Sequence, residues 1–403
     1  MIPLQTPVSP SDPADRDLLR LADHCVKCGL CLPHCPTYAQ TRHEADSPRG
    51  RIALIQGWVT GELEMSNTLA RHLDGCLTCR ACEQACPSLV AVGRLMDGVK
   101  ARRVARLPVW RRALRRRWLS VLSDARLTAL LGRLAGRYRV SGLAGWMERI
   151  GLARRRWLVP YHRLATAMGA AARPMVADDR PAADLDLFVG CMGSSAQGAA
   201  IAATLRVCER LGLRVRIPSG SACCGALMRH NGYADEADRL RAGCVQRHAG
   251  RTLVGLASAC IAELREDSAL RETLEVCDFL DRAVWPASLK LRPLPRRVLV
   301  HEPCTHRHLP GGNAAVYRLL ARVPELEVIP LPGNDTCCGA AGTYLLQQPA
   351  MAAALLRDKL ASLADLKPDI LVTTNPGCAL HLAAGIREAG LTVAVCHPVE
   401  LIL

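Results

Sequence analysis

Eight cysteines in the first hundred residues have a spacing that suits iron–sulfur chemistry. They form two runs with the pattern Cys-x2-Cys-x2-Cys-x3-Cys-Pro. Two-residue gaps let a tight loop wrap three thiolates around one face of a cubane, and the three-residue gap sends the fourth side chain elsewhere. In bacterial ferredoxins the fourth cysteine of each run binds the other cluster. The predicted ligands are Cys25, Cys28, Cys31 and Cys86 for one [4Fe–4S] cluster, and Cys76, Cys79, Cys82 and Cys35 for the second.

Zinc sites or buried free cysteines are the alternatives for these two runs. Zinc favours paired CxxC or Cys–His groups, not a repeated four-cysteine run that ends in Cys-Pro. Soft thiolate ligands also match iron–sulfur clusters. No G-x-G-x-x-G motif follows a strand in this part of the chain, so we expect flavin or nicotinamide chemistry on another subunit.

A second set of cysteines lies in the C-terminal half, where each of two similar segments contains a Cys-Cys-Gly motif. Gly225 and Gly339 would permit the sharp turn that brings both adjacent thiols to one site. An additional cluster or redox site is one interpretation, and a reduced thiol group or a zinc site is the other. The candidate residues are Cys191, Cys223, Cys224 and Cys260 in the first segment, and Cys304, Cys337, Cys338 and Cys378 in the second.

These two segments form an internal repeat. Each begins with a short apolar strand that ends in a cysteine, and each continues through a helix, a strand, the Cys-Cys-Gly motif and a second helix. A third strand then ends in Cys260 or approaches Cys378, and a closing strand follows at 274–280 or 391–403. Alternating strands and helices predict parallel-sheet α/β units, which bind ligands at the carboxyl ends of their strands. The repeat therefore predicts a pseudo-twofold α/β domain.

The whole chain is predicted to be an α+β multidomain protein of 403 residues. An α-helical, ferredoxin-like domain with two [4Fe–4S] clusters is followed by a helical connector and two CCG α/β units. Pro108, Pro160 and Pro174 are expected to interrupt the connector helices. The predicted bounds are 1–100, 101–183, 184–290 and 291–403.

The net charge of +15 is concentrated in the connector. Between Arg102 and Arg163 there are seventeen arginines and only two acids, which equals the whole excess. Tryptophans and leucines alternate with these arginines, as in an interfacial amphipathic helix. A solvated helical face is the plainer interpretation. We favour a surface that docks on an acidic partner or on anionic lipid headgroups. No recognised motif supports nucleic-acid binding, so no nucleic acid is expected as a partner.

The expected location is cytoplasmic, with peripheral contact at the inner face of the cytoplasmic membrane. The segment Met1 to Arg20 contains no apolar signal region, and no later apolar stretch approaches the roughly 20 residues of a membrane span. In a reducing compartment, twenty cysteines point to metal or redox chemistry and not to disulfides.

Some cysteines and histidines fall outside these motifs. Free cysteine often serves as a small buried hydrophobe, and this is the role expected for Cys208, Cys244, Cys277 and Cys396. Any of His230, His301, His306 and His381 could hydrogen-bond a cluster sulfur or relay a proton, although loop or surface roles are commoner. Of the four, we favour a functional role only for His381, three residues after Cys378.

The motifs together resemble the iron–sulfur subunits of bacterial glycolate oxidase (glycolate dehydrogenase). The likeness runs from about residue 20 to the C-terminus. The resemblance implies a hetero-oligomer in which FAD on partner subunits oxidises glycolate to glyoxylate. This chain would pass the electrons on, to membrane quinone or another acceptor, and would have no substrate site of its own. The segments that carry it are CVKCGLCLPHCPTY at 25–38, SPRGRIALI at 47–55, CLTCRACEQACPSLV at 76–90 and the two CCG units.

Related subunits with this layout offer alternatives. They serve anaerobic glycerol-3-phosphate dehydrogenase, lactate utilisation and heterodisulfide reductase, with redox chemistry at the CCG sites. CCG domains like those of heterodisulfide reductase have a fifth cysteine, where this chain has Glu263 and His381. The departure argues against disulfide reduction. A non-enzymatic alternative is an iron–sulfur redox sensor that binds nucleic acid through the connector.

Overall fold

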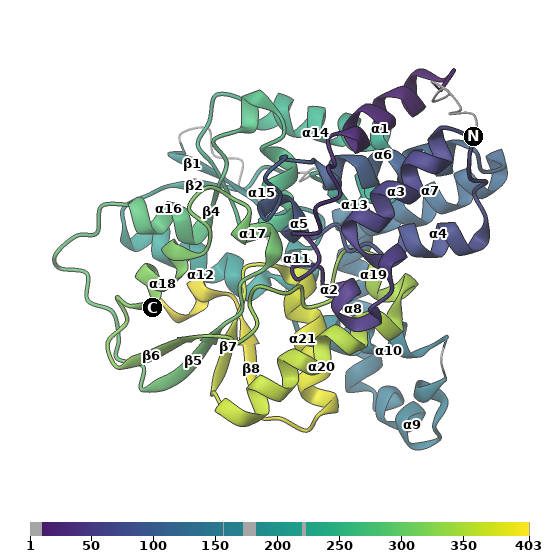
Figure 1. Cartoon of the computed structure of the whole chain (residues 1–403). Coiled ribbons are helices and arrows are strands. Elements are labelled where there is room, and N and C mark those ends of the chain that lie inside the picture. Colours follow the sequence, from purple (N-terminus) through teal and green to yellow (C-terminus); the bar gives the residue numbers. More distant parts are fainter. Residues whose placement is uncertain (1–9, 156, 172–182, 220–222, 403) are drawn as a thin grey trace, which may run out of the picture.

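The computed structural model describes residues 10–155, 157–171, 183–219 and 223–402. Expectations for the start of the chain, for Arg156, for the connector end with Pro174 and for positions 220–222 lie outside the described residues. In Figure 1 the N-terminal helices gather on one side of the molecule and the strands of two sheets on the other. The predicted α+β architecture is confirmed.

The N-terminal part is helical and has a core of its own. Apolar side chains of its first, third and sixth helices, including Leu18, Ile55 and Leu95, are buried together. The third helix begins at Pro48 because the Ser47 hydroxyl accepts a hydrogen bond from the Gly50 N–H at 3.0 Å. The elements are α1 (Pro13–Asp23), α2 (Pro36–Thr41), η1 (Glu44–Asp46), α3 (Pro48–Val59), α4 (Asn67–Asp74), α5 (Ala81–Gln84) and α6 (Val92–Ala105).

The connector is helical where the structure describes it. Pro108 immediately precedes its first helix, and Pro160 lies in the first turn of its last helix. Leu119 packs against Met228 in the first α/β unit, and Met168 packs near Leu380 in the second, so the connector contacts both units. The elements are α7 (Val109–Ser123), α8 (Ala125–Val140), α9 (Leu143–Arg149), η2 (Leu152–Arg154) and α10 (Val159–Ala171).

The C-terminal half contains two parallel four-stranded sheets of identical order, β2-β1-β3-β4 and β6-β5-β7-β8. The predicted pseudo-twofold repeat is confirmed. The first unit contains β1 (Leu185–Phe188), α11 (Gly193–Ala196), α12 (Gly198–Arg210), β2 (Val215–Arg216), α13 (Ala226–Arg229), α14 (Ala234–His248), β3 (Leu253–Gly255), α15 (Ser258–Leu264), η3 (Ser268–Leu270), β4 (Leu274–Glu275) and α16 (Val276–Arg282). The second contains β5 (Arg296–Val300), α17 (Cys304–Arg307), α18 (Ala314–Leu320), β6 (Leu326–Pro330), α19 (Tyr344–Gln347), α20 (Pro349–Leu366), β7 (Ile370–Val372), α21 (Pro376–Glu388), β8 (Ala394–Cys396) and η4 (Pro398–Leu401).

Three strand predictions were wrong in extent. The closing strand expected at 274–280 is only β4, because the Glu275 carboxylate accepts from the Cys277 N–H at 2.6 Å and caps α16. The strand expected to end in Cys260 stops earlier, and Cys260 lies in α15. The strand expected at 391–403 is β8, followed by the η4 turn, which a capping box of His397 and Glu400 begins.

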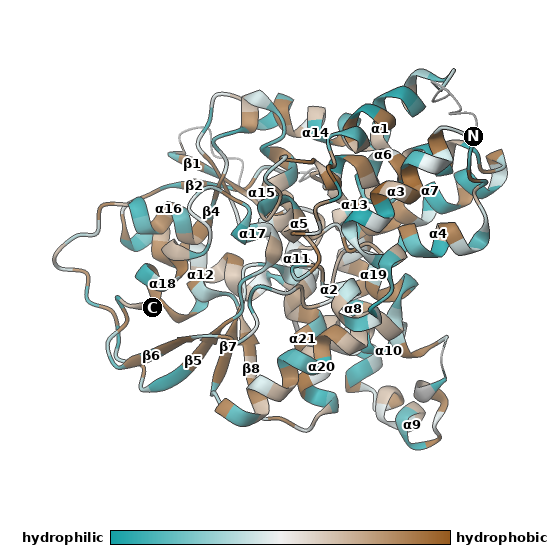
Figure 2. Cartoon of the chain, in the orientation of Figure 1, coloured by the Kyte–Doolittle hydropathy of each residue, from teal (hydrophilic) through white to brown (hydrophobic). Residues whose placement is uncertain are grey.

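The two units share one hydrophobic core. Leu187 and Val254 of the first sheet are buried in the same cluster as Val298 and Val372 of the second. The strands β5 and β7 are largely brown in Figure 2, as expected for buried parallel strands. No helix in the described part of the chain is both long and apolar enough to cross a bilayer.

Candidate functional site

The first cysteine loop joins α1 to α2 and turns twice through left-handed backbone. Lys27 and Gly29 have φ of 57° and 88° and separate Cys25, Cys28 and Cys31 from one another. Such turns bend the chain sharply, so three thiols can face one point. Cys28 is exposed, and burial raises the pKa of the Cys31 thiol, helped by Cys25 and Cys28. The first loop therefore places its cysteines together near the surface.

The second loop has the same backbone conformation. Thr78 and Arg80 have φ of 55° and 60° at the positions that match Lys27 and Gly29. A positive φ is unfavourable for residues other than glycine, so the fold imposes this geometry on both loops. Burial, followed by neighbouring Cys304, raises the pKa of the Cys79 thiol. The thiols of this loop must lose their protons to bind a metal.

Four cysteines line one cavity of the N-terminal part. They are Cys35 from the first run and Cys76, Cys79 and Cys82 from the second. These are the four residues predicted for the second cluster, including the exchanged fourth cysteine. The donor set is four thiols around one small cavity, which fits a cubane cluster. The equivalent exchange of Cys86 to the first loop stays a prediction.

Two arginines at the start of α3 reach the two cysteine runs. Arg49 donates to the Lys27 carbonyl at 3.4 Å and to Glu44 at 2.7 Å. Arg51 is buried, donates to the Thr37 hydroxyl at 3.0 Å, and has a guanidinium nitrogen 4.0 Å from the Cys35 sulfur. Sequence reasoning noted the SPRGRI segment but not this role. A buried guanidinium beside a thiol favours negative charge at the second cluster site.

The second α/β unit brings its four candidate cysteines together. Cys304 begins α17, Cys337 and Cys338 lie in the loop before Gly339, and Cys378 lies in the first turn of α21. The Cys338 and Cys378 sulfurs are 3.1 Å apart. Cys304 and Cys337 are close enough to influence the pKa of Cys378.

The first unit repeats this arrangement with Cys191, Cys223, Cys224 and Cys260. Cys191 lies within hydrogen-bonding reach of Cys223, and Cys224 lies within reach of Cys260. The connector closes over this site, because the Thr128 hydroxyl of α8 donates to the Cys191 carbonyl at 2.5 Å.

A large cavity of about 1230 Å³ joins these sites. It is lined by Cys76, by apolar side chains of the connector and by seven cysteines of the two α/β units: Cys191, Cys223, Cys224, Cys260, Cys304, Cys337 and Cys378. The repeated fold therefore places both thiol groups around one space, on the side that faces the N-terminal domain.

Contacts between the N-terminal domain and the second unit bring cysteines of both parts close. His308 donates from Nε2 to the Cys79 carbonyl at 2.9 Å, and the Tyr344 hydroxyl donates to the Gly75 carbonyl at 3.1 Å. Leu77 packs in one apolar cluster with Cys337, with Cys79 and Cys304 at its edge. The second cluster site is thus adjacent to the thiols of the second unit.

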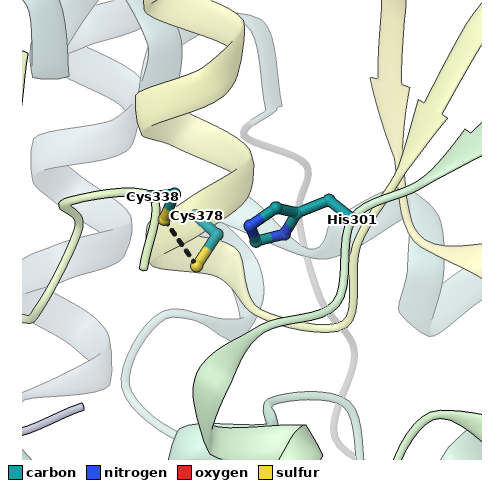
Figure 3. A group of neighbouring side chains, drawn as sticks. All are labelled: His301, Cys338 and Cys378. Atoms are coloured by element: carbon teal, nitrogen blue, oxygen red, sulfur yellow. Dashed lines mark hydrogen bonds between the residues drawn. The ribbon is translucent and has the colours of Figure 1, made fainter. Parts of the chain in front are cut away.

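The histidine that approaches these thiols is His301 and not His381. The structure places His381 with its Nε2 3.2 Å from the Ala352 carbonyl oxygen. Figure 3 shows His301 pointing toward Cys338 and Cys378, and a ring nitrogen lies within 4.8 Å of both sulfurs. Burial, with a smaller contribution from Lys359, lowers the pKa of His301 to about 3, so this imidazole is neutral.

Of the four remaining cysteines, three lie in or against the shared core and Cys244 lies beside the thiols of the first unit. Cys208 and Cys277 belong to the shared core, and Cys396 packs against it. Cys244 is buried in a smaller core cluster and donates from its sulfur to the Cys223 carbonyl at 3.5 Å. Their packing agrees with the structural role expected of them, and Cys244 also supports the Cys-Cys-Gly turn.

Comparison with known proteins adds two family matches. The 4Fe-4S dicluster domain matches residues 21–90. The cysteine-rich domain called CCG matches residues 185–264 and 298–383.

Curated relatives cover nearly the whole chain. It is 31% identical to the glycolate oxidase iron-sulfur subunit of Escherichia coli K12, over 94% of this chain and 92% of that protein. The chain belongs to the family of glycolate oxidase iron–sulfur subunits. A probable glycolate oxidase iron-sulfur subunit of Bacillus subtilis 168 is 28% identical, over 94% of this chain and 93% of that protein. One subunit of the fumarate reductase (CoM/CoB) of Methanothermobacter marburgensis is 24% identical, over 98% of this chain and 74% of that protein.

This family membership confirms the resemblance that the two cysteine runs and the two CCG units indicated from the sequence. The chain is an iron–sulfur electron-transfer subunit of an oxidoreductase complex, with a 4Fe-4S dicluster domain. Membership in this family implies association with other subunits.

Proposed function

We propose that this chain carries electrons from FAD on a partner subunit, where glycolate or another 2-hydroxy acid is oxidised, to membrane quinone. Glycolate is taken from the names of the Escherichia coli and Bacillus subtilis relatives, which match over more than 90% of both chains. One observation carries the proposal: cysteines extend from a loop with an exposed Cys28, through a small cavity lined by Cys35, Cys76, Cys79 and Cys82, to a large cavity lined by cysteines of both α/β units.

Electrons would enter at the first cysteine loop. Cys28 is exposed there, and the flanking Val26 and Leu30 are 68% and 57% exposed. Leu89, three residues after Cys86, is 80% exposed. Exposed apolar side chains beside a redox group suit docking of another subunit. We therefore propose that the flavoprotein partner covers the loops of Cys25, Cys28, Cys31 and Cys86.

The chain's own residues would set the route onward. We propose that Cys25, Cys28, Cys31 and Cys86 hold one [4Fe–4S] cluster and that Cys76, Cys79, Cys82 and Cys35 hold the other. When bound, these clusters supply one-electron redox chemistry. Arg51 places a positive charge next to Cys35. The contacts of Cys79 with the second unit lead directly to Cys304.

Electrons would leave through the large cavity. Its walls include Leu131 and Leu134 of α8 and Met168 of α10, next to the cysteines of the two units. A cavity of about 1230 Å³ with apolar walls can hold a quinone-sized acceptor, since small-molecule sites commonly occupy several hundred cubic ångströms.

The connector would bring this cavity to the membrane. Tryptophans that would lie at an interface, Trp110, Trp118, Trp146 and Trp157, are all exposed. Arg111 lies over the Trp110 ring at 5.0 Å, and many other arginines share these helices. Each arginine near an anionic membrane surface contributes about 1 kcal/mol of attraction. We propose peripheral docking of α7–α9 on anionic lipid.

A second candidate is an iron–sulfur subunit of a related complex, with redox chemistry on a substrate at the CCG sites. The observation that favours it is that both thiol groups line one cavity large enough for a small molecule. In that case the cavity would bind a substrate and not quinone.

The test uses the complex purified anaerobically with its partner subunits. We expect the complex to reduce quinone when glycolate is added. Cys79→Ser should lower the rate of quinone reduction at least about 100-fold. The same variant should still oxidise glycolate when an artificial acceptor takes the electrons directly from the flavin. Cys208→Ser, which changes a buried cysteine of the core, is the matched control. Substrate oxidation by this chain alone, or unchanged quinone reduction in Cys79→Ser, would contradict the proposal. Liposomes that contain anionic lipid should bind the complex, and neutral liposomes should bind it less.

A further inference from the structure

The two CCG units have different residues beside their otherwise equivalent thiols. Cys304 corresponds to Cys191, so His301 of the second unit occupies the position of Phe188 in the first. The helices α14 and α20 align through close contacts of their Ala237 and Ala352 backbones with the glycine of each Cys-Cys-Gly motif. Counting along these helices, Lys359 occupies the position of Cys244. The first unit thus has an aromatic ring and a thiol where the second has an imidazole and an amine.

His301 is held in a fixed orientation. Its backbone N–H donates to the Val372 carbonyl at 2.9 Å, and its Nδ1 is 2.9 Å from the Thr373 hydroxyl. Metal-binding histidines characteristically use one nitrogen for such a hydrogen bond and the other for the metal. The imidazole points toward the sulfurs of Cys338 and Cys378, as Figure 3 shows. His301, Cys338 and Cys378 are all buried.

Lys359 supplies a second, independent indication. Its side chain is 1% exposed, and its Nζ donates to the Gly333 carbonyl. Within the described ranges no carboxylate forms an ion pair with Lys359. Burial lowers the pKa of its amine, and the neighbours whose negative charge would oppose that shift are Cys338, Cys337, Asp335 and Cys378. A buried ammonium without an anionic partner is strongly unfavourable. Thiolates around a metal centre would provide that anion.

We propose that the second unit binds an iron–sulfur centre through five donors, Cys304, Cys337, Cys338, Cys378 and Nε2 of His301. The inference rests on the proposed redox role of the CCG cysteines and adds a ligand that no cysteine pattern contains. In the second unit His301 takes the part of the fifth donor that His381, at the position of the fifth cysteine, does not supply, because its Nε2 lies 3.2 Å from the Ala352 carbonyl oxygen. Exchanging a thiolate for a neutral imidazole raises the reduction potential of a centre. The centre nearest Cys79 would therefore attract electrons from the second cluster.

The experiment compares three variants in the purified complex. Cys338→Ser removes a thiol ligand, His301→Phe inserts the residue of the first unit, and His301→Cys restores a donor with a different charge. Cys208→Ser is the control. Iron and acid-labile sulfide per chain, EPR spectra and potentiometric titration are measured on each, with circular dichroism to verify folding.

The wild-type chain should contain clearly more iron than the roughly eight atoms of two cubanes. Cys338→Ser and His301→Phe should lose this excess and its EPR signal, while the ferredoxin-type signals stay unchanged. His301→Cys should keep the iron and shift the centre to a lower potential.

Three outcomes would overturn the inference, and they separate it from the proposed function. If Cys338→Ser loses no iron, the second unit holds no centre, and its proposed redox role fails as well. If Cys338→Ser loses iron but His301→Phe keeps the iron, spectrum and potential, then His301 is no ligand while the proposed function stands. Zinc in place of the excess iron would show a structural site instead. Should His301→Phe not fold, the potential of the folded His301→Cys variant decides.

Discussion

In the first α/β unit, Phe188 and Cys244 lie next to the four cysteines; in the second, His301 and Lys359 occupy the corresponding positions. Strand order, the Cys-Cys-Gly turn and the helix that approaches it are otherwise the same. The comparison teaches that the backbone of the repeat determines where the thiols lie. Two further positions, one at the end of a strand and one in a helix, then set the charge and the donor atoms around these thiols.

A second difference lies in the central strands. Asp186 of β1 is fully buried and binds Arg216 at 2.8 Å, His248 at 2.8 Å and Arg251 at 2.7 Å. The matching position of β5 is Leu299, which is buried in apolar surroundings. The first unit therefore relies on a buried charge network where the second relies on apolar packing.

Substitution of Asp186 should cause the largest loss of stability. Asp186→Ala removes the acid that faces three basic side chains, and removing one member of a buried ion pair costs about 3–5 kcal/mol. Urea unfolding should show this loss of stability. Asp184→Ala is the matched control, since that carboxylate pairs with Arg214 at the surface and should matter much less. Equal losses in the two variants would show that the buried network stabilises the fold no more than a surface ion pair does.

The same network predicts a pH dependence. Burial opposes ionisation of Asp186, but hydrogen bonds from Arg216, His248 and Arg251 outweigh it and lower its pKa. The folded state therefore binds this proton less tightly than the unfolded state, where the pKa is about 3.9. The stabilisation is complete above that unfolded value and is lost as pH falls through the lower folded pKa. Asp186→Asn should flatten this acid limb in unfolding experiments.

Replacing the glycine of either Cys-Cys-Gly turn by alanine should destabilise the chain to a similar extent. This prediction tests whether the two units have equivalent backbones. Gly225 and Gly339 both have φ of 93°. A Cβ at either position would lie 2.6 Å from the Ala237 oxygen or 2.8 Å from the Ala352 oxygen. Changing either glycine to alanine should cost at least about 1–2 kcal/mol from the left-handed backbone alone, and the close contact adds to it.

Gly243 provides the control for these two turns. It lies in α14 with open space around its Cβ position, so Gly243→Ala should stabilise the chain by about 0.5–1 kcal/mol. Chemical denaturation measures all three variants. If one turn tolerates alanine and the other does not, the two units are not equivalent in backbone.

Much of this organisation could be predicted because it depends on the spacing of residues that are close together in the sequence. The Cys-x2-Cys gaps require tight turns, and the repeated strand–cysteine and Cys-Cys-Gly motifs predicted two parallel sheets, which the structure shows. The boundaries between strands and the helices that follow them were harder to predict. Cys277 and Cys260 lie in helices because capping and the packing of neighbouring helices outweigh their apolar, strand-like surroundings.

The residues that surround the thiols could not be predicted in the same way. Arg51 is 16 residues from Cys35, and Lys359 is about 20 residues from each of the three nearby thiols, Cys337, Cys338 and Cys378. A single histidine near a cysteine in sequence is an ambiguous signal, and the sequence alone favours His381, three residues after Cys378, whereas the structure places His301 near the thiols. Comparing the two copies position by position could have revealed His301 and Lys359, because Phe188 and Cys244 differ from them in chemistry.

Lys359→Met tests whether the difference between the units is electrostatic as well as structural. Loss of the buried positive charge should make reduction of the second-unit centre harder, by roughly 60 mV, which is a tenfold change for a one-electron couple. The metal-free chain should be no less stable, since an apolar side chain replaces a buried cation. Lys367→Met removes the same charge from the exposed end of α20 and should leave the potential nearly unchanged. EPR-monitored potentiometry distinguishes the two, and equal potentials in both variants would mean that Lys359 does not face an anionic centre.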